Sequence, residues 1–333
     1  MSVFHITGSI DAQRALREGA FFSARAFEKD GPTSAFYVAE LTGQAISLGH
    51  YQRAEIALHP RAHDRAVRRV TGGSAIAAGA GIVYVAVGLR DASVFLECPK
   101  ARVLNRNVRG LLVGLTSAGA GTHYFGRDFV SVERRPAIYV AWTRTPEQHV
   151  LLEFFVSANA SFVPGDGVSA YPAHSSPPLL DKVPITLAEA WGREATLNEV
   201  ADRILHKGYA KTYGLTLEES APAPSDEKAA RYFTDVVTDD SALRWSPPHE
   251  VPIGFISAGL RRDANGDVHE AVLSGDFFQD AAAPALLNDT LRGSKGTRED
   301  LVRAINTVYG RDGLVIEGVP SLNTILDAFT DVI

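Results

Sequence analysis

The chain has 333 residues, and 33 Lys and Arg against 39 Asp and Glu give it a formal net charge of −6. This balance excludes an overall basic surface for duplex nucleic acid, and the length is enough for a large core in two domains. A single cysteine, Cys98, excludes an intrachain disulfide and any CxxC metal site. No apolar run reaches the roughly 20 residues of a membrane span, and the N-terminus lacks the order of a secretory signal. We therefore expect a cytoplasmic protein without a membrane or nucleic-acid partner.

The N-terminal part of the sequence predicts strands and helices in alternation. Asp11 is placed to cap a helix over residues 10–27, in which small and apolar residues recur on one helix face. The other elements expected before residue 90 are a helix at 60–67 and strands at 2–7, 36–41, 45–48 and 82–89.

The middle of the chain continues this mixture. A loop rich in Pro, Gly and Ser is expected at residues 164–184. The regular elements expected here are helices at about 100–117 and 186–213, and strands at 95–98, 122–125, 129–132, 136–142 and 150–156.

The C-terminal third begins with a change of composition. Residues 218–229 are acidic, polar and rich in proline, which is typical of a linker or a surface crossing. Beyond it, strands at 253–260 and 268–273 flank Asn265-Gly266, a pair that supplies the positive φ angles of a hairpin turn. The last elements expected are helices at roughly 282–292, 297–309 and 320–332.

These elements predict an α+β fold rather than a doubly wound α/β fold, because most strands read as antiparallel neighbours. We expect one domain at residues 1–215, a linker or crossing segment at 216–250, and a second domain at 251–333.

Residues 68–89 are the most informative stretch. They begin with the sequence RRVTGGSA. Two arginines beside a glycine turn can bind an anionic group, because side-chain charge and backbone N–H donors converge there. No lysine follows the glycines, which excludes a Walker loop, and the run continues into a strand, which excludes the dinucleotide fingerprint. A surface turn that feeds a buried strand is the alternative interpretation.

Four segments, in this order, resemble the lipoate–protein ligase family within the biotin/lipoate ligase and octanoyltransferase group. Residues 45–50, AISLGH, stand where the family has a strand ending in Ile-Gly-Arg. Residues 68–75 match its Arg-Arg-x-Ser/Thr-Gly-Gly-Gly-Ala turn, and residues 126–128 match the start of its Gly-Arg-Asn-Asp segment. In the tail, residues 272–278 and 291–293 resemble the Gly-Asp-Phe-Phe and Leu-x-Gly of its accessory domain.

The resemblance implies a mixed, mainly antiparallel sheet with helices, followed by a small α+β accessory domain. It also implies a reaction in which ATP, with Mg²⁺, and lipoate or octanoate form an acyl-adenylate, which a lysine of a lipoyl-type carrier domain then attacks. Arg135 would take the catalytic cationic role, and residues 82–87 would line an acyl tunnel. The residues that would bind the nucleotide or acyl-adenylate, or organise the turn beside it, are Arg69, Gly72, Gly73, Ser74, Ala75, Ile76, Ala77, Arg127 and Asp128.

The sequence departs from the family pattern where adenylation takes place. The family's Arg-Lys reads Arg134-Arg135 here, and the Ser-Gly-Ser-Ala that follows it is absent. A guanidinium keeps the charge of the lysine but has a different, planar geometry. Ser74 replaces the third glycine, and Ala78-Gly79 replaces a His-Asp pair.

Two hypotheses follow. The first is a lipoate–protein ligase or acyltransferase-like enzyme, and the second is a non-catalytic protein of the same fold that binds a ligand or a carrier domain. An acyl-sized tunnel that ends beside Arg69 and Arg135 would support a function with the acyl group. A site filled by Ile138, Tyr139 and Trp142 would argue against it.

Two further candidates are weaker. Cys98 would serve as an acyl-accepting thiol if it were activated at the end of a strand, although a single cysteine is more often a small buried residue. None of the 10 histidines forms a metal-binding pattern in the sequence, so no metal site is expected.

Overall fold

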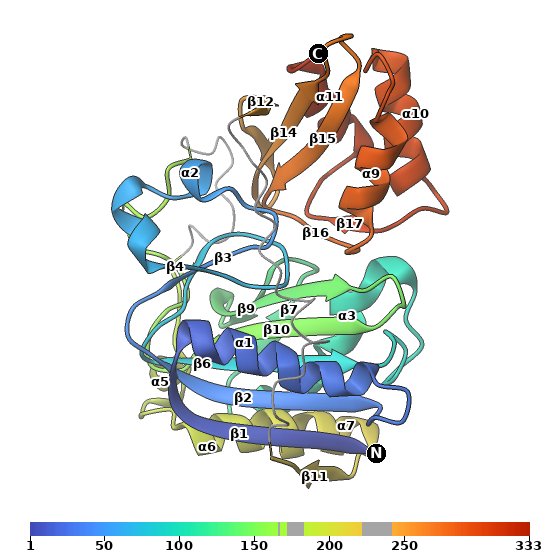
Figure 1. The fold of residues 1–333 in the computed structure, drawn as a ribbon. Helices are drawn as coiled ribbons and strands as arrows, with labels where there is room; N and C mark the ends of the chain where they lie inside the picture. The colour runs from blue at the N-terminus through green and yellow to red at the C-terminus, as the bar shows by residue number, and fades with distance from the viewer. Residues whose placement is uncertain (166, 172–182, 222–241) are drawn as a thin grey trace.

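The computed structural model describes residues 1–165, 167–171, 183–221 and 242–333. An eight-stranded sheet forms the base of the N-terminal part (Figure 1). The three strands at one edge are parallel to one another, and all other neighbours are antiparallel. In spatial order the strands are β11 (Leu217–Glu219), β1 (Ser2–Asp11), β2 (Ser34–Thr42), β6 (Ile82–Leu89), β10 (Val150–Ser157), β9 (Arg135–Arg144), β8 (Phe129–Val132) and β7 (Thr122–Tyr124).

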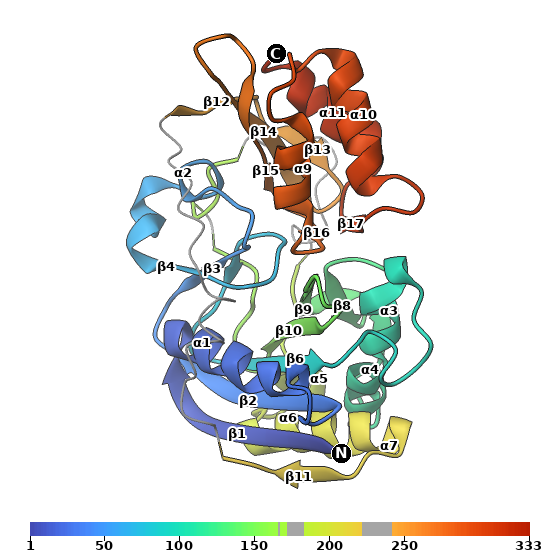
Figure 2. The same cartoon turned by 45° about the vertical axis from the view of Figure 1, so that its right-hand side comes forward.

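Helices cover both faces of this sheet because its central strands are apolar on both sides. In β2, Phe36 packs against Tyr209 with ring centroids 5.1 Å apart, whereas the hydroxyl of Tyr37 donates to Glu18 on the other face at 3.1 Å. Figure 2 shows α1 on one face and α6 and α7 across the other. The helical segments of this part are α1 (Ala12–Ser23), η1 (Ala24–Phe27), α2 (Ala54–Ala57), η2 (Pro60–Arg65), η3 (Lys100–Arg102), α3 (Val103–Asn107), α4 (Arg109–Thr116), α5 (Leu187–Trp191), α6 (Leu197–Ile204), the π-helix η5 (Leu205–Ala210) and α7 (Lys211–Tyr213).

The first helix begins where the sequence predicts. The Asp11 side chain accepts a hydrogen bond from the backbone N–H of Arg14 at 3.0 Å, which satisfies one of the unpaired donors at the helix start. The α-helix ends at Ser23, and a 3₁₀ turn continues to Phe27.

Several expected elements differ from the structure. Residues 95–98 form no strand, and the helix expected at 100–117 consists of separate segments. Residues 60–67, expected as a helix, form the 3₁₀ segment η2 and then the start of strand β4 (Ala66–Arg68). Segment 216–250, expected as a linker, contributes β11 to the edge of the large sheet, and its residues 222–241 lie outside the described part of the chain. Its residues 244–245 and 249–250 form strands of the C-terminal sheet, which therefore begins before residue 251. Most of the loop expected at 164–184 also lies outside it.

A smaller sheet stands between the large sheet and the C-terminal part. Its strands are β4 (Ala66–Arg68), β3 (Ile46–Leu48) and β5 (Ile76–Ala77), with β3 in the centre. The glycine turn connects β4 to β5, so both ends of the turn are fixed by pairing to the same strand.

The C-terminal part has its own hydrophobic core. The predicted hairpin around Asn265-Gly266 is confirmed, and Gly266 has a φ of +78°. The strands here are β12 (Arg244–Trp245), β13 (His249–Val251), β14 (Gly254–Arg262), β15 (Val268–Gly275), β16 (Phe278–Gln279) and β17 (Ile316–Glu317), and the helices are α9 (Ala283–Leu291), α10 (Arg298–Tyr309) and α11 (Leu322–Thr330). In the described ranges no helix is both long enough and apolar enough to cross a membrane.

Buried polar contacts join the two parts. Arg144 of β9 forms a two-pronged ion pair with Asp280, with nitrogen–oxygen distances of 2.7 and 2.6 Å. The Gln52 amide donates to Asp276 at 2.5 Å, and the rings of Tyr51 and Phe277 stack with centroids 5.0 Å apart. Since a buried ion pair is stable only with both partners present, Arg144 and Asp280 fix the C-terminal part against the large sheet.

Replacing Arg144 with Ala leaves Asp280 buried without its cation. We expect the variant Arg144→Ala to lose about 3–5 kcal/mol of unfolding free energy and to become more sensitive to protease at the junction. Urea unfolding and limited proteolysis measure both effects. Arg311→Ala, at an exposed position, is the matched control and should behave as the wild type. Equal stability of the two variants would show that the ion pair does not hold the parts together.

Candidate functional site

The glycine turn is buried, not exposed as its alternative interpretation proposed. Residues 71–74 are all buried, and the turn lies where the small sheet, the large sheet and the C-terminal part meet. The backbone N–H of Gly73 donates to the carbonyl of Phe277 at 2.8 Å, and the Ser74 hydroxyl donates to the carbonyl of Ile253 at 2.7 Å. Both bonds join the turn to the C-terminal part of the protein.

Arg69 is the centre of this arrangement. Only 1% of its surface is exposed, and all three of its guanidinium nitrogens donate hydrogen bonds within the protein. The acceptors are the carbonyls of Ser47, Gly72 and Ser74, at 2.7–3.2 Å, and the hydroxyl of Tyr139 at 3.1 Å. The guanidinium thus donates to carbonyl oxygens of the turn itself. A buried cation is stable only when hydrogen-bond acceptors surround it.

The glycines of the turn are required by close packing. A Cβ atom on Gly73, which has a φ of +90°, would lie 2.0 Å from the Tyr139 hydroxyl and 2.6 Å from the Phe278 ring. A Cβ atom on Gly72 would lie 2.1 Å from the carbonyl oxygen of Phe277. These distances are shorter than any contact a side chain tolerates, so protein atoms occupy the space that the missing side chains leave.

A buried carboxylate supports the start of the turn. Glu153 of β10 accepts hydrogen bonds from the hydroxyl and the backbone N–H of Thr71, and also from Tyr84 at 2.7 Å. A carboxylate with three donors is well satisfied in a buried position. The other residues of the turn, Ile76 and Ala77, form strand β5 and pair with β3, and Ala75 precedes them.

The two arginines predicted beside the site have other partners. Arg135 donates to the carboxylate of Glu189 at 2.6 Å and to the carbonyls of Val183 and Pro184. It follows a two-residue turn in which Glu133 and Arg134 both have positive φ angles. None of the hydrogen bonds of Arg135 is made with the glycine turn.

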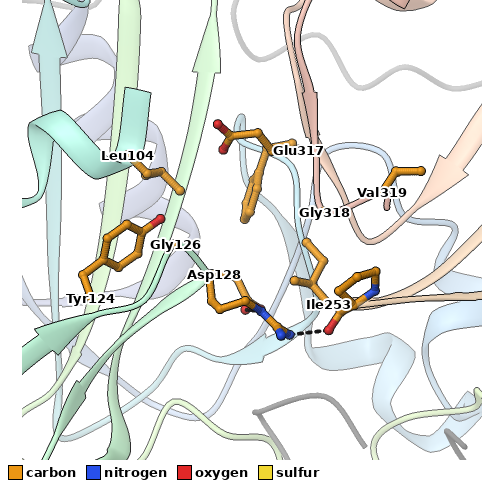
Figure 3. A pocket seen from close by; sticks show the side chains of 11 residues that line it. Leu104, Tyr124, Gly126, Asp128, Ile253, Glu317, Gly318 and Val319 are labelled. Carbon is orange, nitrogen blue, oxygen red and sulfur yellow. Dashed lines mark hydrogen bonds and ion pairs between the residues drawn. The ribbon is translucent and has the colours of Figure 1, made fainter. Parts of the chain in front are cut away.

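Arg127 and Asp128 line a cavity of about 200 Å³ beside the turn (Figure 3). One wall comes from the N-terminal part and the other from the C-terminal part, and Arg127 joins them through a hydrogen bond to the carbonyl of Pro252. Ile253 and Phe278 line the cavity and also contact the glycine turn, so the two features share a wall. The remaining lining residues are Leu104, Tyr124, Gly126, Glu317, Gly318 and Val319.

The cavity carries two acidic side chains. Burial raises the pKa of Asp128 to about 6, although the nearby Arg127 guanidinium opposes the shift. Burial also raises the pKa of Glu317, whose carboxylate accepts a hydrogen bond from the indole of Trp142 at 2.9 Å. Carboxyl groups with raised pKa values are typical of functional sites and of buried ion networks alike.

Cys98 has no activating surroundings. Burial raises the pKa of its thiol, which lowers the fraction of reactive thiolate at neutral pH. The residue does not follow a strand, so the environment expected for an acyl-accepting thiol is not the one observed.

The comparisons with known proteins bear on the fold. Neither a protein-family model nor a curated protein matches the sequence. Among solved structures, Plasmodium falciparum LipL1 in complex with lipoate superposes with a TM-score of 0.70 at 12% identity, covering 98% of both chains. The chain has the fold of lipoate–protein ligases.

Two further structures match over the larger part of the chain. A bipartite lipoate protein ligase from Thermoplasma acidophilum, described with its E2 lipoyl domain, covers 72% of this chain and 96% of its own at a TM-score of 0.55 and 12% identity. Lipoate-protein ligase A bound with ATP covers the same shares at a TM-score of 0.53 and 11% identity. These superpositions confirm the α+β fold predicted from the sequence.

The sequence named Tyr139 only as a residue that could fill the site and Phe278 only within the segment 272–278, and it did not identify Glu153 or Glu317 as partners of the site. Tyr139, Glu153, Phe278 and Glu317 all contact the turn or the cavity, and each comes from a segment remote from residues 68–75. A buried-looking acid inside an apolar strand, as Glu153 is, was the one signal available. In the described ranges no group of three or more His, Cys, Asp or Glu side chains is placed to hold a metal ion.

The hydrogen bonds of Arg69 depend on the forked shape of its guanidinium. We expect Arg69→Lys to lower the free energy of unfolding by about 3–5 kcal/mol, because an ammonium cannot reach all four acceptors and leaves buried carbonyls unpaired. Thermal and urea unfolding measure the loss, with the exposed Arg61→Lys as the control. An unchanged stability combined with weaker nucleotide binding would instead assign Arg69 to a ligand site.

Asp276 is a buried acid whose carboxylate accepts hydrogen bonds from the Gln52 amide and from the backbone N–H of Phe255. Burial raises the pKa of Asp276 to about 7, although these two donors oppose the shift. The folded state therefore binds the proton more tightly than the unfolded chain does. The contribution is fully present below about pH 4 and is lost as the pH rises through about 7.

We expect the unfolding free energy of the wild type to fall relative to that of Asp276→Asn over this range, with a slope of at most about 1.4 kcal/mol per pH unit. Urea unfolding at a series of pH values gives the difference. Asp312→Asn, at an exposed position, should follow the wild type throughout. Parallel curves for the wild type and Asp276→Asn would contradict the shift.

Proposed function

We propose that this protein is a cytoplasmic, non-catalytic member of the lipoate-ligase fold that binds a lipoyl-type carrier domain. The observation that carries the proposal is the closed glycine turn. Arg69 donates through all of its nitrogens to protein oxygens, and Tyr139 and Phe278 pack onto Gly73. A turn that binds phosphate presents donors to the ligand, whereas the Arg69 guanidinium and the N–H groups of Thr71 and Gly73 donate to protein oxygens.

The surroundings of the turn support the same conclusion. Ile138, Tyr139 and Trp142 are completely buried. The cavity beside the turn is lined by Arg127 and Asp128 and by residues of the C-terminal part, and Arg69 and strand β6 are not among its lining residues.

The carrier domain is proposed as partner by analogy of fold. The Thermoplasma acidophilum ligase of the same fold is described with its E2 lipoyl domain. Docking of a domain requires a matching outer surface and does not require the adenylate pocket. A closed glycine turn is therefore compatible with binding of a carrier domain.

The second candidate is the ligase itself, with ATP, Mg²⁺ and lipoate or octanoate as its reactants. The observation that favours it is the extent of the match, because LipL1 in complex with lipoate covers 98% of this chain, including the C-terminal part. In this case Arg135 would have to leave Glu189 to serve as the catalytic cation.

Titration calorimetry separates the two candidates. We expect an apo lipoyl domain with its unmodified lysine to bind the full-length protein with an affinity on the order of micromolar. A non-hydrolysable octanoyl-adenylate analogue, ATP–Mg²⁺, lipoate and octanoate should give no heat. The wild type and Arg135→Ala should bind the domain equally well.

The transfer assay completes the experiment. Mass spectrometry of the lipoyl domain after incubation with ATP, Mg²⁺ and octanoate should show no added acyl group. An acyl-modified domain, formed by the wild type and not by Arg135→Ala, would establish the ligase instead. No binding of the domain, with no binding of the analogue, would contradict both candidates.

A further inference from the structure

The cavity lined by Arg127 and Asp128 contains a polar group without a partner. Asp128 is 1% exposed, and its Oδ2 atom accepts no hydrogen bond within the protein. Its other oxygen lies 4.0 Å from Nε of Arg127, beyond hydrogen-bond distance. Arg127 donates through another nitrogen to the carbonyl of Pro252, and its Nε is also buried without a hydrogen-bond partner among the described residues. A buried carboxylate oxygen in this position favours a ligand that donates to it.

Two more acceptors face the same space. Figure 3 shows the carboxylate of Glu317 and the hydroxyl of Tyr124 on the side of the cavity near Leu104. Tyr124, Asp128 and Glu317 therefore all line one cavity of about 200 Å³. Three acceptor groups match an alkylammonium, which has three donors and no acceptor.

The rest of the lining fits the carbon atoms of such a ligand. Leu104, Ile253, Phe278 and Val319 supply apolar walls, and the volume of about 200 Å³ is smaller than that of pockets for drug-sized ligands. Long amphipathic side chains bury their methylene groups along apolar surface in this way. The Arg127 side chain is 26% exposed, so the cavity reaches solvent at its rim.

The charges exclude other ligands. Two carboxylates against one guanidinium repel a nucleotide phosphate, and the described residues form no group of metal ligands here. A guanidinium ligand is planar and needs a forked acceptor, whereas the acceptors here come from three separate elements.

We propose that this cavity binds an aliphatic primary ammonium group, supplied either by a small alkylamine or by a lysine side chain that a protein partner presents. The lysine source rests on the proposed binding of a carrier domain, whereas the small-amine source does not. Asp128 and Glu317 are the residues that determine the specificity.

The test uses the full-length protein and two probes, n-butylammonium and Nα-acetyl-lysine N-methylamide, with the Nε-acetylated lysine amide as the neutral control. NMR titration should show saturable binding of both amines and none of the control. Asp128→Asn and Glu317→Gln should each weaken binding roughly tenfold or more, because each removes one charged acceptor. Glu97→Gln removes an exposed charge elsewhere and should leave the affinity unchanged.

A loss of stability is not expected to account for weaker binding by Asp128→Asn. Asp128→Asn removes a buried charge of raised pKa, so we expect its stability at neutral pH to equal or exceed that of the wild type. Equal binding of the neutral control, unchanged affinity in Asp128→Asn, or no binding of either amine would each overturn the proposal.

A lipoyl domain distinguishes the two sources. If lysine is the ligand, the domain with a free lysine should bind at least about tenfold more tightly than the same domain with that lysine acylated, and Asp128→Asn should abolish the difference. If the domain does not bind while the small amines do, the proposed function fails and the ammonium site stands. If the domain binds equally with and without its free amine, the proposed function stands and the lysine source is excluded.

Discussion

The position of the glycine turn depends on the buried guanidinium of Arg69. A full positive charge inside the protein is tolerated only where acceptors surround it, and here they come from strand β3, from the turn and from strand β9. One side chain therefore fixes the small sheet against the large one and sets the path of the backbone from Thr71 to Ser74. The C-terminal part then packs onto that path through Phe277 and Phe278.

This arrangement inverts the chemistry expected of an arginine beside glycines. In an anion site, backbone N–H groups and the guanidinium point at a common ligand. Here the guanidinium points at the turn's carbonyls, and the N–H groups of Thr71 and Gly73 point at protein oxygens. The neighbouring cavity is lined by two carboxylates and one guanidinium, so acceptors outnumber cations beside the turn.

How much the sequence predicts depends on the range of each interaction. The helix cap at Asp11 and the hairpin at Asn265-Gly266 are determined by residues that are close together in the sequence, and both are confirmed. The bond between Gln52 and Asp276 joins residues 224 positions apart, and no local pattern reports it. Strand β11 was missed because its pairing to β1 is decided by the edge of the sheet and not by its own acidic sequence. For Arg69, the sequence identifies the residue and its neighbours but not which backbone groups its donors reach.

The same contacts determine what a ligand must do to open the turn. Exposing Gly72 and Gly73 to a nucleotide requires Phe277 and Phe278 to move away from the turn. Such a movement would also break the bonds from Arg144 to Asp280 and from Gln52 to Asp276. A ligand shifts such an equilibrium only by its difference in affinity for the two states, and reversing a 99:1 preference takes about 5.5 kcal/mol. Opening would also separate the walls that hold Asp128 and Glu317, since they belong to opposite sides of the cavity. An adenylate at the turn and an ammonium group in the cavity therefore require different arrangements of the two parts, and the buried ion pair favours the second.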